Sequence, residues 1–295
     1  MDGHQEQIGS NLPALEGDRW VIPLAHGRSL EMGQRTIIMG ILNVTPDSFS
    51  DGGRFFDDGR AVAYALEMAE AGADIIDIGG ASSRPDSVMA TESEEIQRIL
   101  PVIKQLASHN LILSVDTFRS SVAEAALAQG AHIINDIGNF EMDPDILAVL
   151  IKWKAAVVLM HNRLQIRQGE KYQDIVADIS AELRQAIATA VNAGLDEERI
   201  IIDPGLGFGK TPAENLLLIR RLHDFRSIGR PILLGASRKR FIGHILNLDP
   251  RERLEGSLAA AVIGIMNGAS IVRVHDVKET KRAAVIADAV RLGHG

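Results

Sequence analysis

Short apolar runs rich in β-branched residues alternate with helical patterns about eight times from Thr36 onward, and this alternation strongly constrains the fold. Uncharged runs of this kind are typical of strands buried on both faces of a parallel sheet. The runs predict strands over residues 36–42, 74–78, 111–115, 132–135, 155–160, 199–202, 231–235 and 270–274. Apolar residues at helical spacing predict helices over 58–72, 91–108, 121–130, 143–154, 172–194, 212–227, 251–268 and 278–292.

About eight strand–helix units in a chain of 295 residues predict one α/β domain, a closed (β/α)8 TIM barrel. An open doubly wound sheet is the main alternative, because it uses the same alternation. No linker divides the chain, so we expect the barrel over residues 36–295. Residues 1–35 are expected to form an N-terminal extension, whose apolar pieces 20–24 and 29–32 pair as a β-hairpin that plugs or covers the barrel.

Three helix starts carry capping signals. Thr91 with Glu94, and Thr211 with Glu214, match the capping box, in which each side chain accepts a hydrogen bond from the other residue's backbone. Asp143 before a proline predicts an N-cap followed by proline at the first helical position.

Composition excludes several classes of function. The chain is 46% hydrophobic, carries a net charge of −8 and contains no cysteine. The negative charge argues against nucleic acid as a partner, and no apolar run approaches the roughly 20 residues that span a membrane. Without cysteine there are no disulfides or thiolate nucleophiles, and the N-terminus resembles no signal or transit peptide. We therefore expect a cytoplasmic protein that binds small molecules.

Polar or charged residues follow nearly every predicted strand. They include Asn43, Ser83, Arg84, Asp116, Asn135, His161, Asp203, Lys239, Arg273 and His275, while Met160 and Gly235 end two of the predicted strands beside them. Because the carboxyl ends of barrel strands meet at one rim, we expect these residues to form a single site. The alternative is that each one is only a helix cap or a turn residue.

The chemistry of this set points to two parts of one ligand. Asp116, Asn135 and Asp203 suit the edge of a flat polar heterocycle, since a carboxylate accepts two N–H bonds from an amino-pyrimidine. Arg84, Lys239, Arg273 and His275 suit an anion such as a phosphate or diphosphate. The alternatives are that Lys239 is a solvated charge and that His275 is a structural histidine.

The glycine-rich segment 203–211 does not match a nucleotide-binding loop. Pro204 stands where a Walker A loop needs glycine, and Lys210 stands where a dinucleotide fingerprint would need one. Its glycines instead predict a tight turn or a close approach of the backbone to a ligand.

These motifs together resemble the dihydropteroate synthases. The resemblance rests on residues 43–53, 114–117, 134–137, 203–210, 237–243 and 273–276, in that order. It implies a (β/α)8 barrel that condenses 6-hydroxymethyl-7,8-dihydropterin diphosphate with p-aminobenzoate, giving 7,8-dihydropteroate and diphosphate in folate biosynthesis. It also implies a homodimer, with the small-residue helix 258–268 as a candidate face, although packing of this helix against the barrel explains its small residues equally well.

The resemblance assigns roles to individual residues. Asn43 would bind Mg²⁺ that holds the diphosphate, while Ser83, Arg84, Arg273 and His275 would contact the diphosphate or anion pocket. Asp116, Asn135, Asp203 and Lys239 would hold the pterin, with Met160 and Phe208 near its ring and Gly235 beside it. Catalysis is expected from Asn43, Lys239, Arg273 and His275.

Three departures from the family pattern leave other functions open. Ala81 replaces a glutamate, residues 164–166 replace Gly-Thr-Pro, and Arg240 stands where serine is common. The first two motivate a non-catalytic pterin-binding paralogue as an alternative. A methyltetrahydrofolate-dependent corrinoid methyltransferase of the same barrel type is the other alternative, and it would not need the Mg²⁺ loop.

Overall fold

The computed structural model describes residues 19–45, 58–81, 90–164 and 169–293. All neighbouring strands of its 8-stranded sheet pair in parallel, in the order β8-β7-β6-β5-β4-β3-β10-β9. The strands are β3 (Ile37–Asn43), β4 (Ile75–Gly79), β5 (Ile112–Asp116), β6 (Ile133–Asp136), β7 (Ala156–Met160), β8 (Ile200–Asp203), β9 (Leu233–Leu234) and β10 (Ile271–Val274). A parallel bridge between Ile202 and Ile232 joins the two ends of this order. The predicted TIM barrel is thereby confirmed, and the open-sheet alternative is wrong.

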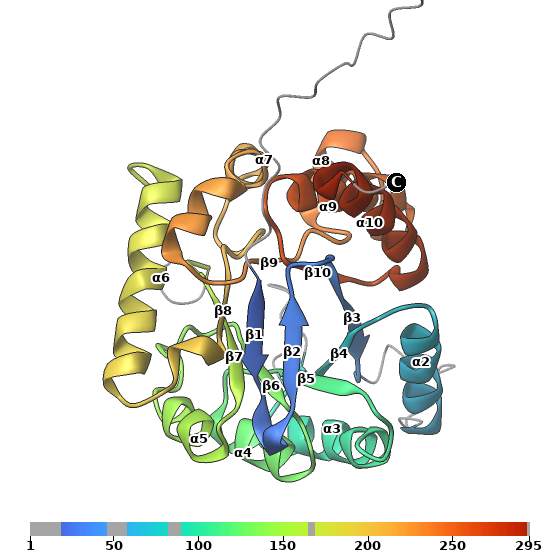
Figure 1. Ribbon diagram of the computed structural model, residues 1–295, viewed down its shortest axis with the longest axis vertical. Coiled ribbons are helices and arrows are strands. Elements are labelled where there is room, and N and C mark those ends of the chain that lie inside the picture. The colour runs from blue at the N-terminus through green and yellow to red at the C-terminus, as the bar shows by residue number, and fades with distance from the viewer. Residues whose placement is uncertain (1–18, 46–57, 82–89, 165–168, 294–295) are drawn as a thin grey trace, which may run out of the picture.

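Helices surround the strands (Figure 1). They are α2 (Asp58–Glu70), α3 (Glu92–Leu106), α4 (Ser120–Ala128), α5 (Ile146–Trp153), α6 (Ile175–Asn192), α7 (Pro212–Arg220), α8 (Arg240–Leu246), α9 (Leu254–Met266) and α10 (Val277–Leu292), with short 3-10 helices η1 (Ala25–Gly27), η2 (Glu197–Arg199), η3 (Leu222–Ile228) and η4 (Pro250–Glu252). The capping boxes at Thr91 and Thr211 are both formed, as predicted. None of the helices in the described ranges has the length and apolar character to cross a membrane.

Two helix predictions were wrong in detail. The helix predicted from Asp143 begins as an α-helix only at Ile146. The Asp143 carboxylate accepts the Asp145 N–H at 3.2 Å in the turn before it, and it also accepts the Ser120 N–H at 2.7 Å at the start of α4. The helix predicted over 212–227 ends as an α-helix at Arg220 and continues as the 3-10 helix η3. In addition, α8 was not predicted at all.

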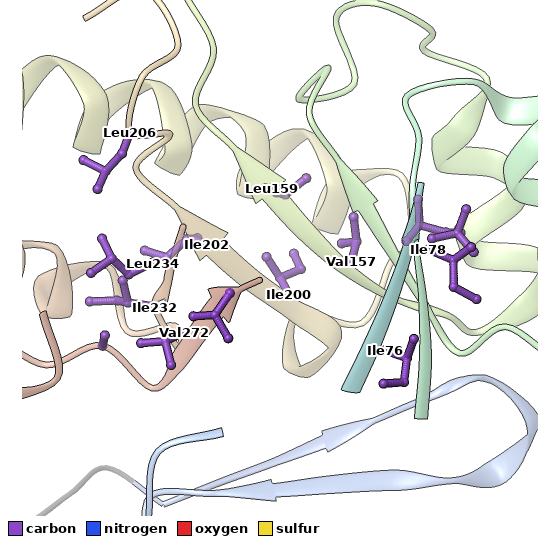
Figure 2. Close-up of a cluster of buried hydrophobic side chains, with 14 of the residues drawn as sticks. Ile76, Ile78, Val157, Leu159, Ile200, Ile202, Leu206, Ile232, Leu234 and Val272 are labelled. Atoms are coloured by element: carbon purple, nitrogen blue, oxygen red, sulfur yellow. The ribbon is translucent and has the colours of Figure 1, made fainter. Parts of the chain in front are cut away.

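Alternation along the strands creates two hydrophobic cores. Side chains such as Ile76, Val157 and Ile202 point outward and pack under the helices (Figure 2). Their neighbours Ile75, Val158 and Ile201 point inward and fill the barrel. The strands are therefore buried on both faces, which explains why their sequences are almost continuously apolar.

The N-terminal hairpin closes one end of the barrel. Its strands β1 (Trp20–Pro23) and β2 (Ser29–Met32) are antiparallel, and their buried side chains, Ile22 among them, join the inner core. Arg28 Nη1 donates to the Leu111 carbonyl at 2.6 Å, just before β5 begins. The hairpin therefore plugs the amino-terminal ends of the strands, which leaves the carboxyl ends as the mouth of the barrel.

Candidate active site at the carboxyl ends of the strands

The residues that the sequence placed at strand ends share one orientation. Side chains two or four positions apart on a strand point to the same face of the sheet. Each of these residues that lies on a strand stands at such a spacing from a side chain of the inner core, so it points into the barrel. They are Asn43 on β3, Asp116 on β5, Asn135 on β6, Met160 on β7, Asp203 on β8 and Arg273 on β10, while Gly235 and His275 directly follow β9 and β10. The barrel thus gathers these side chains at its mouth. Ser83 and Arg84 lie outside the described residues.

Arg273 is held between two carboxylates at the floor of the mouth. Its Nε donates to Asp77 Oδ2 at 2.6 Å, and its Nη2 donates to Asp116 Oδ2 at 2.6 Å. Asn135 Nδ2 donates to the same Asp77 oxygen at 3.1 Å. The cluster therefore links β10, β4, β5 and β6 and fixes the guanidinium before any ligand binds.

Asp77 was missed by the sequence analysis. It stands inside the predicted strand 74–78, and the signal that could have found it is a carboxylate within an otherwise apolar run. The side chain is fully buried, and its Oδ1 has no hydrogen-bond partner among the described residues. A buried acceptor of this kind can take an N–H from a ligand or a water molecule.

Asp203 and Lys239 form the opposite wall. Asp203 Oδ1 accepts the Gly205 N–H at 2.7 Å, and a side-chain carbon added at Gly235 would lie 3.9 Å from Asp203 Oδ2. Lys239 Nζ lies 4.5 Å from the centroid of the Phe208 ring, a cation–π distance. Glycine at 235 thus leaves room beside the carboxylate for a flat ligand.

Apolar side chains lie beside these polar groups. Phe208 packs with Met160 and Ile137 in a small buried cluster that is separate from the two main cores. A few fixed polar groups against an apolar wall are typical of a pocket that binds a heterocycle.

Burial shifts the pKa values of the site. It raises the pKa of Asp116 to about 6 against the opposing charge of Arg273, and it raises the pKa of Asp203. Burial also lowers the pKa of Lys239 to about 8, although Asp203 favours the ammonium. Burial disfavours the charge on Arg273, but Asp77 and Asp116 outweigh it and raise that pKa.

His275 is a neutral hydrogen-bond donor. Ser237 Oγ accepts the His275 backbone N–H at 3.2 Å and lies 3.0 Å from His275 Nδ1. A hydroxyl that accepts one hydrogen bond can still donate another, and donation to Nδ1 places the imidazole proton on Nε2. Burial, followed by the charge of Arg273, lowers the His275 pKa to about 4, so the ring is neutral at pH 7.

Asn43 is the residue assigned to Mg²⁺ by the resemblance. It ends β3 in register with Gly79, and its Oδ1 would lie 3.8 Å from a side-chain carbon added there. Within the described ranges no group of three or more acidic, histidine or cysteine residues could hold a metal on its own. A single amide oxygen fits Mg²⁺ that arrives with a diphosphate, because this ion keeps several waters and phosphate ligands.

Known proteins resemble this chain over most of its length. A profile of the family described as "Pterin binding enzyme" matches residues 39–275. The dihydropteroate synthase of Bacillus subtilis is 46% identical over 263 residues, covering 89% of this chain and 91% of that protein. A Xanthomonas albilineans dihydropteroate synthase solved with 7,8-dihydropteroate has a TM-score of 0.82 and 41% identity, covering 91% of this chain and 99% of that one. The same enzyme solved with 4-aminobenzoic acid has a TM-score of 0.85 and 42% identity, covering 92% and 98%.

Proposed function

The chain belongs to the pterin-binding enzyme family as a dihydropteroate synthase, and we infer that the mouth of its barrel is where the reaction takes place. The enzyme condenses 6-hydroxymethyl-7,8-dihydropterin diphosphate with p-aminobenzoate, giving 7,8-dihydropteroate and diphosphate. The observation that carries the assignment of the site is the convergence of Arg273, Asp77, Asp116 and Asn135 on one fixed cluster, opposite Asp203 and Lys239.

We propose that the polar floor holds the pterin. Asp203 keeps Oδ2 beside the open space at Gly235, where a carboxylate can accept N–H bonds from the amino-pyrimidine edge. Asn135 and Asp116 face the ring from the other strands, and Met160 with Phe208 supplies its apolar contact. This arrangement explains why amide and carboxylate groups recur at one level of the barrel.

The reaction needs charge stabilisation more than proton transfer. Breaking the methylene–oxygen bond builds negative charge on the diphosphate and positive charge on a carbon conjugated with the pterin. Fixed donors aimed at a developing charge contribute about 2.7–4 kcal/mol each in comparable sites. We propose that Lys239, Arg273 and the Nε2–H of His275 provide this field, together with Ser83 and Arg84.

Mg²⁺ is the proposed metal of the reaction. When bound, it would neutralise charge on the departing diphosphate, and Asn43 would hold it through its amide oxygen. The attacking p-aminobenzoate amine is already neutral at pH 7. No strong general base is needed, which agrees with a His275 ring that offers a donor to the site.

The assay that tests the function is diphosphate release, measured with and without p-aminobenzoate. Release that requires p-aminobenzoate supports the synthase. Binding of pterin diphosphate without release would support the non-catalytic paralogue that Ala81 suggested. Methyl transfer from methyltetrahydrofolate without diphosphate chemistry would support the corrinoid methyltransferase.

We also propose a homodimer through α9 and α10, which pack against each other. The small residues of α9 allow the helix to pack closely against the barrel. A side-chain carbon added at Gly264 would lie 2.1 Å from Leu234 Cδ2 on β9. Both helices expose apolar side chains, with Ile286 and Val290 each 67% exposed and Ile263 50% exposed. A contiguous exposed apolar face is typical of a protein–protein contact, and a second copy of the chain would cover it.

The proposed compartment is the cytoplasm. A chain of 295 residues with no cysteine suits a reducing environment. The net charge of −8 supports small-molecule partners and no nucleic acid.

A further inference from the structure

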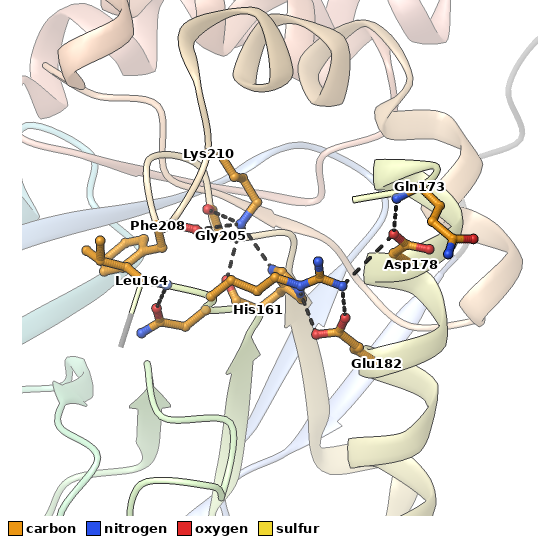
Figure 3. Close-up of polar contacts among 10 residues, drawn as sticks. His161, Leu164, Gln173, Asp178, Glu182, Gly205, Phe208 and Lys210 are labelled. Atoms are coloured by element: carbon orange, nitrogen blue, oxygen red, sulfur yellow. Dashed lines mark hydrogen bonds and ion pairs between the residues drawn. The ribbon is translucent and has the colours of Figure 1, made fainter. Parts of the chain in front are cut away.

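Lys210 is a partly buried lysine that the mechanism above does not use. Its Nζ lies 2.8 Å from the Gly205 carbonyl oxygen, 3.0 Å from the Phe208 carbonyl oxygen and 3.0 Å from His161 Nδ1 (Figure 3). An ammonium group has three N–H donors and no acceptor, so these three short contacts match its donor capacity. The His161 carbonyl oxygen lies further away, at 3.5 Å. In the sequence, Lys210 was a mismatch to a nucleotide fingerprint and the last residue of the 203–210 motif, with no role assigned to it.

The contact with Lys210 fixes the direction of the two hydrogen bonds that the His161 ring makes. Burial lowers the pKa of Lys210 to about 7, and in the ammonium form the group can only donate. In that form His161 Nδ1 accepts, and the imidazole proton lies on Nε2. His161 Nε2 lies 3.0 Å from Glu182 Oε2 on α6 and donates to it. Burial lowers the pKa of His161 to about 4, which agrees with a neutral ring in this position. We call Lys210, His161 and Glu182 the Lys210 chain.

Glu182 anchors the outer end of the Lys210 chain. Arg163 also donates to this carboxylate, and the Arg163 guanidinium lies 4.1 Å from the centroid of the Tyr172 ring. Burial disfavours the charged carboxylate, but the hydrogen bonds from His161 and Arg163 outweigh it and lower the Glu182 pKa to about 2. The chain therefore ends on a charged group that is tied to α6.

The turn that Lys210 holds carries part of the substrate pocket. Gly205 donates its N–H to Asp203, and Phe208 places its ring beside Lys239. The turn lies directly on the segment after β7, since a side-chain carbon at Gly205 would come within 1.9 Å of the His161 carbonyl oxygen. Gly205 has φ +70°, a left-handed conformation that favours glycine. Lys210 thus bonds to carbonyls at both ends of the segment 205–208.

We propose that Lys210 is a positioning residue for the substrate site, holding the turn 205–208 so that Phe208 and Asp203 keep their places in the pterin pocket. It touches no reacting atom and acts through the backbone of the turn. His161 and Glu182 act one step further back by fixing the direction of the ammonium. This inference rests on the proposed function, because it assigns the pterin to the pocket that Phe208 and Asp203 line.

The test compares Lys210→Met with Lys152→Met. Lys152 is an exposed lysine paired with Glu124 on the outside of the barrel, so it controls for the loss of one lysine charge. Binding of 6-hydroxymethylpterin, which lacks the diphosphate, is measured by calorimetry. We expect Lys210→Met to weaken binding by about tenfold or more and Lys152→Met to change it by less than about twofold. In turnover, Lys210→Met should raise KM for pterin diphosphate about tenfold while kcat falls less than about threefold.

A double-mutant cycle with Phe208→Ala separates positioning from a general loss of stability. If Lys210 acts by placing Phe208, then Lys210→Met should weaken binding much less in the Phe208→Ala background than in the wild type. Equal losses in the two backgrounds, or wild-type affinity in Lys210→Met, would overturn the proposal.

A second variant keeps the test valid if Lys210→Met does not fold. Glu182→Gln keeps the shape of the anchor and removes its charge, and we expect about a threefold loss of pterin affinity. A Glu182→Gln variant whose pterin affinity is unchanged within measurement error would overturn the proposed role of the Lys210 chain. A wild-type chain that binds the pterin but releases no diphosphate would contradict the proposed function alone. Normal wild-type turnover with an unaffected Lys210→Met would contradict this inference alone.

Discussion

Arg273 on β10 and Asp77 on β4 lie 2.6 Å apart, from Nε to Oδ2, and the Asp77 carboxylate is fully buried. A buried charge is stable only when it is paired and hydrogen-bonded, so each group depends on the other. Asp116 completes the pair as a second acceptor for the same guanidinium. The floor of the mouth is therefore built in advance, which lowers the reorganisation that substrate binding requires.

Asp77→Asn should remove the charge that fixes Arg273 while keeping the side-chain shape. Breaking one partner of a buried ion pair typically lowers the free energy of unfolding by about 3–5 kcal/mol, and the isosteric change should lie near the lower end. The control is Glu124→Gln, whose partner Lys152 is 64% exposed, and it should lose about 1 kcal/mol or less. Urea denaturation measures both variants, and equal losses would contradict the assigned importance of Asp77.

Asn43→Ala should separate pterin binding from metal-dependent turnover. Asn43 ends β3 at the rim and does not belong to the cluster of Arg273, Asp77, Asp116 and Asn135. The variant should bind 6-hydroxymethylpterin like the wild type, while its kcat/KM at limiting Mg²⁺ should fall by about tenfold or more. Asn110→Ala, at the hairpin end of the barrel, is the matched control. Full Mg²⁺-dependent activity in Asn43→Ala would show that the metal assignment is wrong.

His132 should make stability depend on pH with a defined sign. Burial, followed by the charge of Arg28, lowers its folded-state pKa from 6.5 to about 4. The unfolded chain therefore takes up a proton first as the pH falls, and the stabilising contribution of the neutral ring is lost between about pH 6.5 and pH 4. The ring accepts the Leu113 N–H at 3.1 Å through Nδ1, a bond that asparagine can imitate.

The comparison of wild type with His132→Asn isolates this group from the other titrating residues. Between pH 7 and pH 4 the wild type should lose on the order of 2 kcal/mol relative to the variant. Urea denaturation at several pH values measures the difference. A difference that does not change with pH would contradict the neutral, buried state of His132.

Ile286→Asp should dissociate the proposed homodimer. The side chain is 67% exposed on α10, so the substitution disturbs little inside one subunit but places a charge in an apolar interface. Val21→Asp, at an exposed position on the hairpin, is the control. Sedimentation should show a dimer for the wild type and the control and a monomer for Ile286→Asp. A wild type that sediments as a monomer would exclude this interface.

The fold could be predicted from sequence because strands buried on both faces leave a local signal. The positions of Asn43, Asp116 and Asp203 followed from the same signal, since each stands where an apolar run ends. The capping boxes at Thr91 and Thr211 were also predictable, because their partners lie only three residues away.

Features that depend on contacts between distant segments could not be predicted. Asp143 was assigned to its own helix, and besides the local bond from the Asp145 N–H its carboxylate also accepts the N–H of Ser120 on a neighbouring element. Asp77 was read as part of a strand because its partner Arg273 is 196 residues away. The contact of Lys210 with His161, 49 residues apart, has no local signal at all. In each case the barrel brings together residues that the sequence separates.

The most direct test of the account measures diphosphate release by purified wild type and Asp203→Asn, with Mg²⁺ and pterin diphosphate, in the presence and absence of p-aminobenzoate. Wild type should release diphosphate and form dihydropteroate when p-aminobenzoate is present, and Asp203→Asn should lose about a hundredfold or more in kcat/KM because the acceptor for the pterin edge is lost. A wild type that binds the pterin yet releases nothing, or an Asp203→Asn variant with full activity, would contradict the assignment of this mouth as the active site.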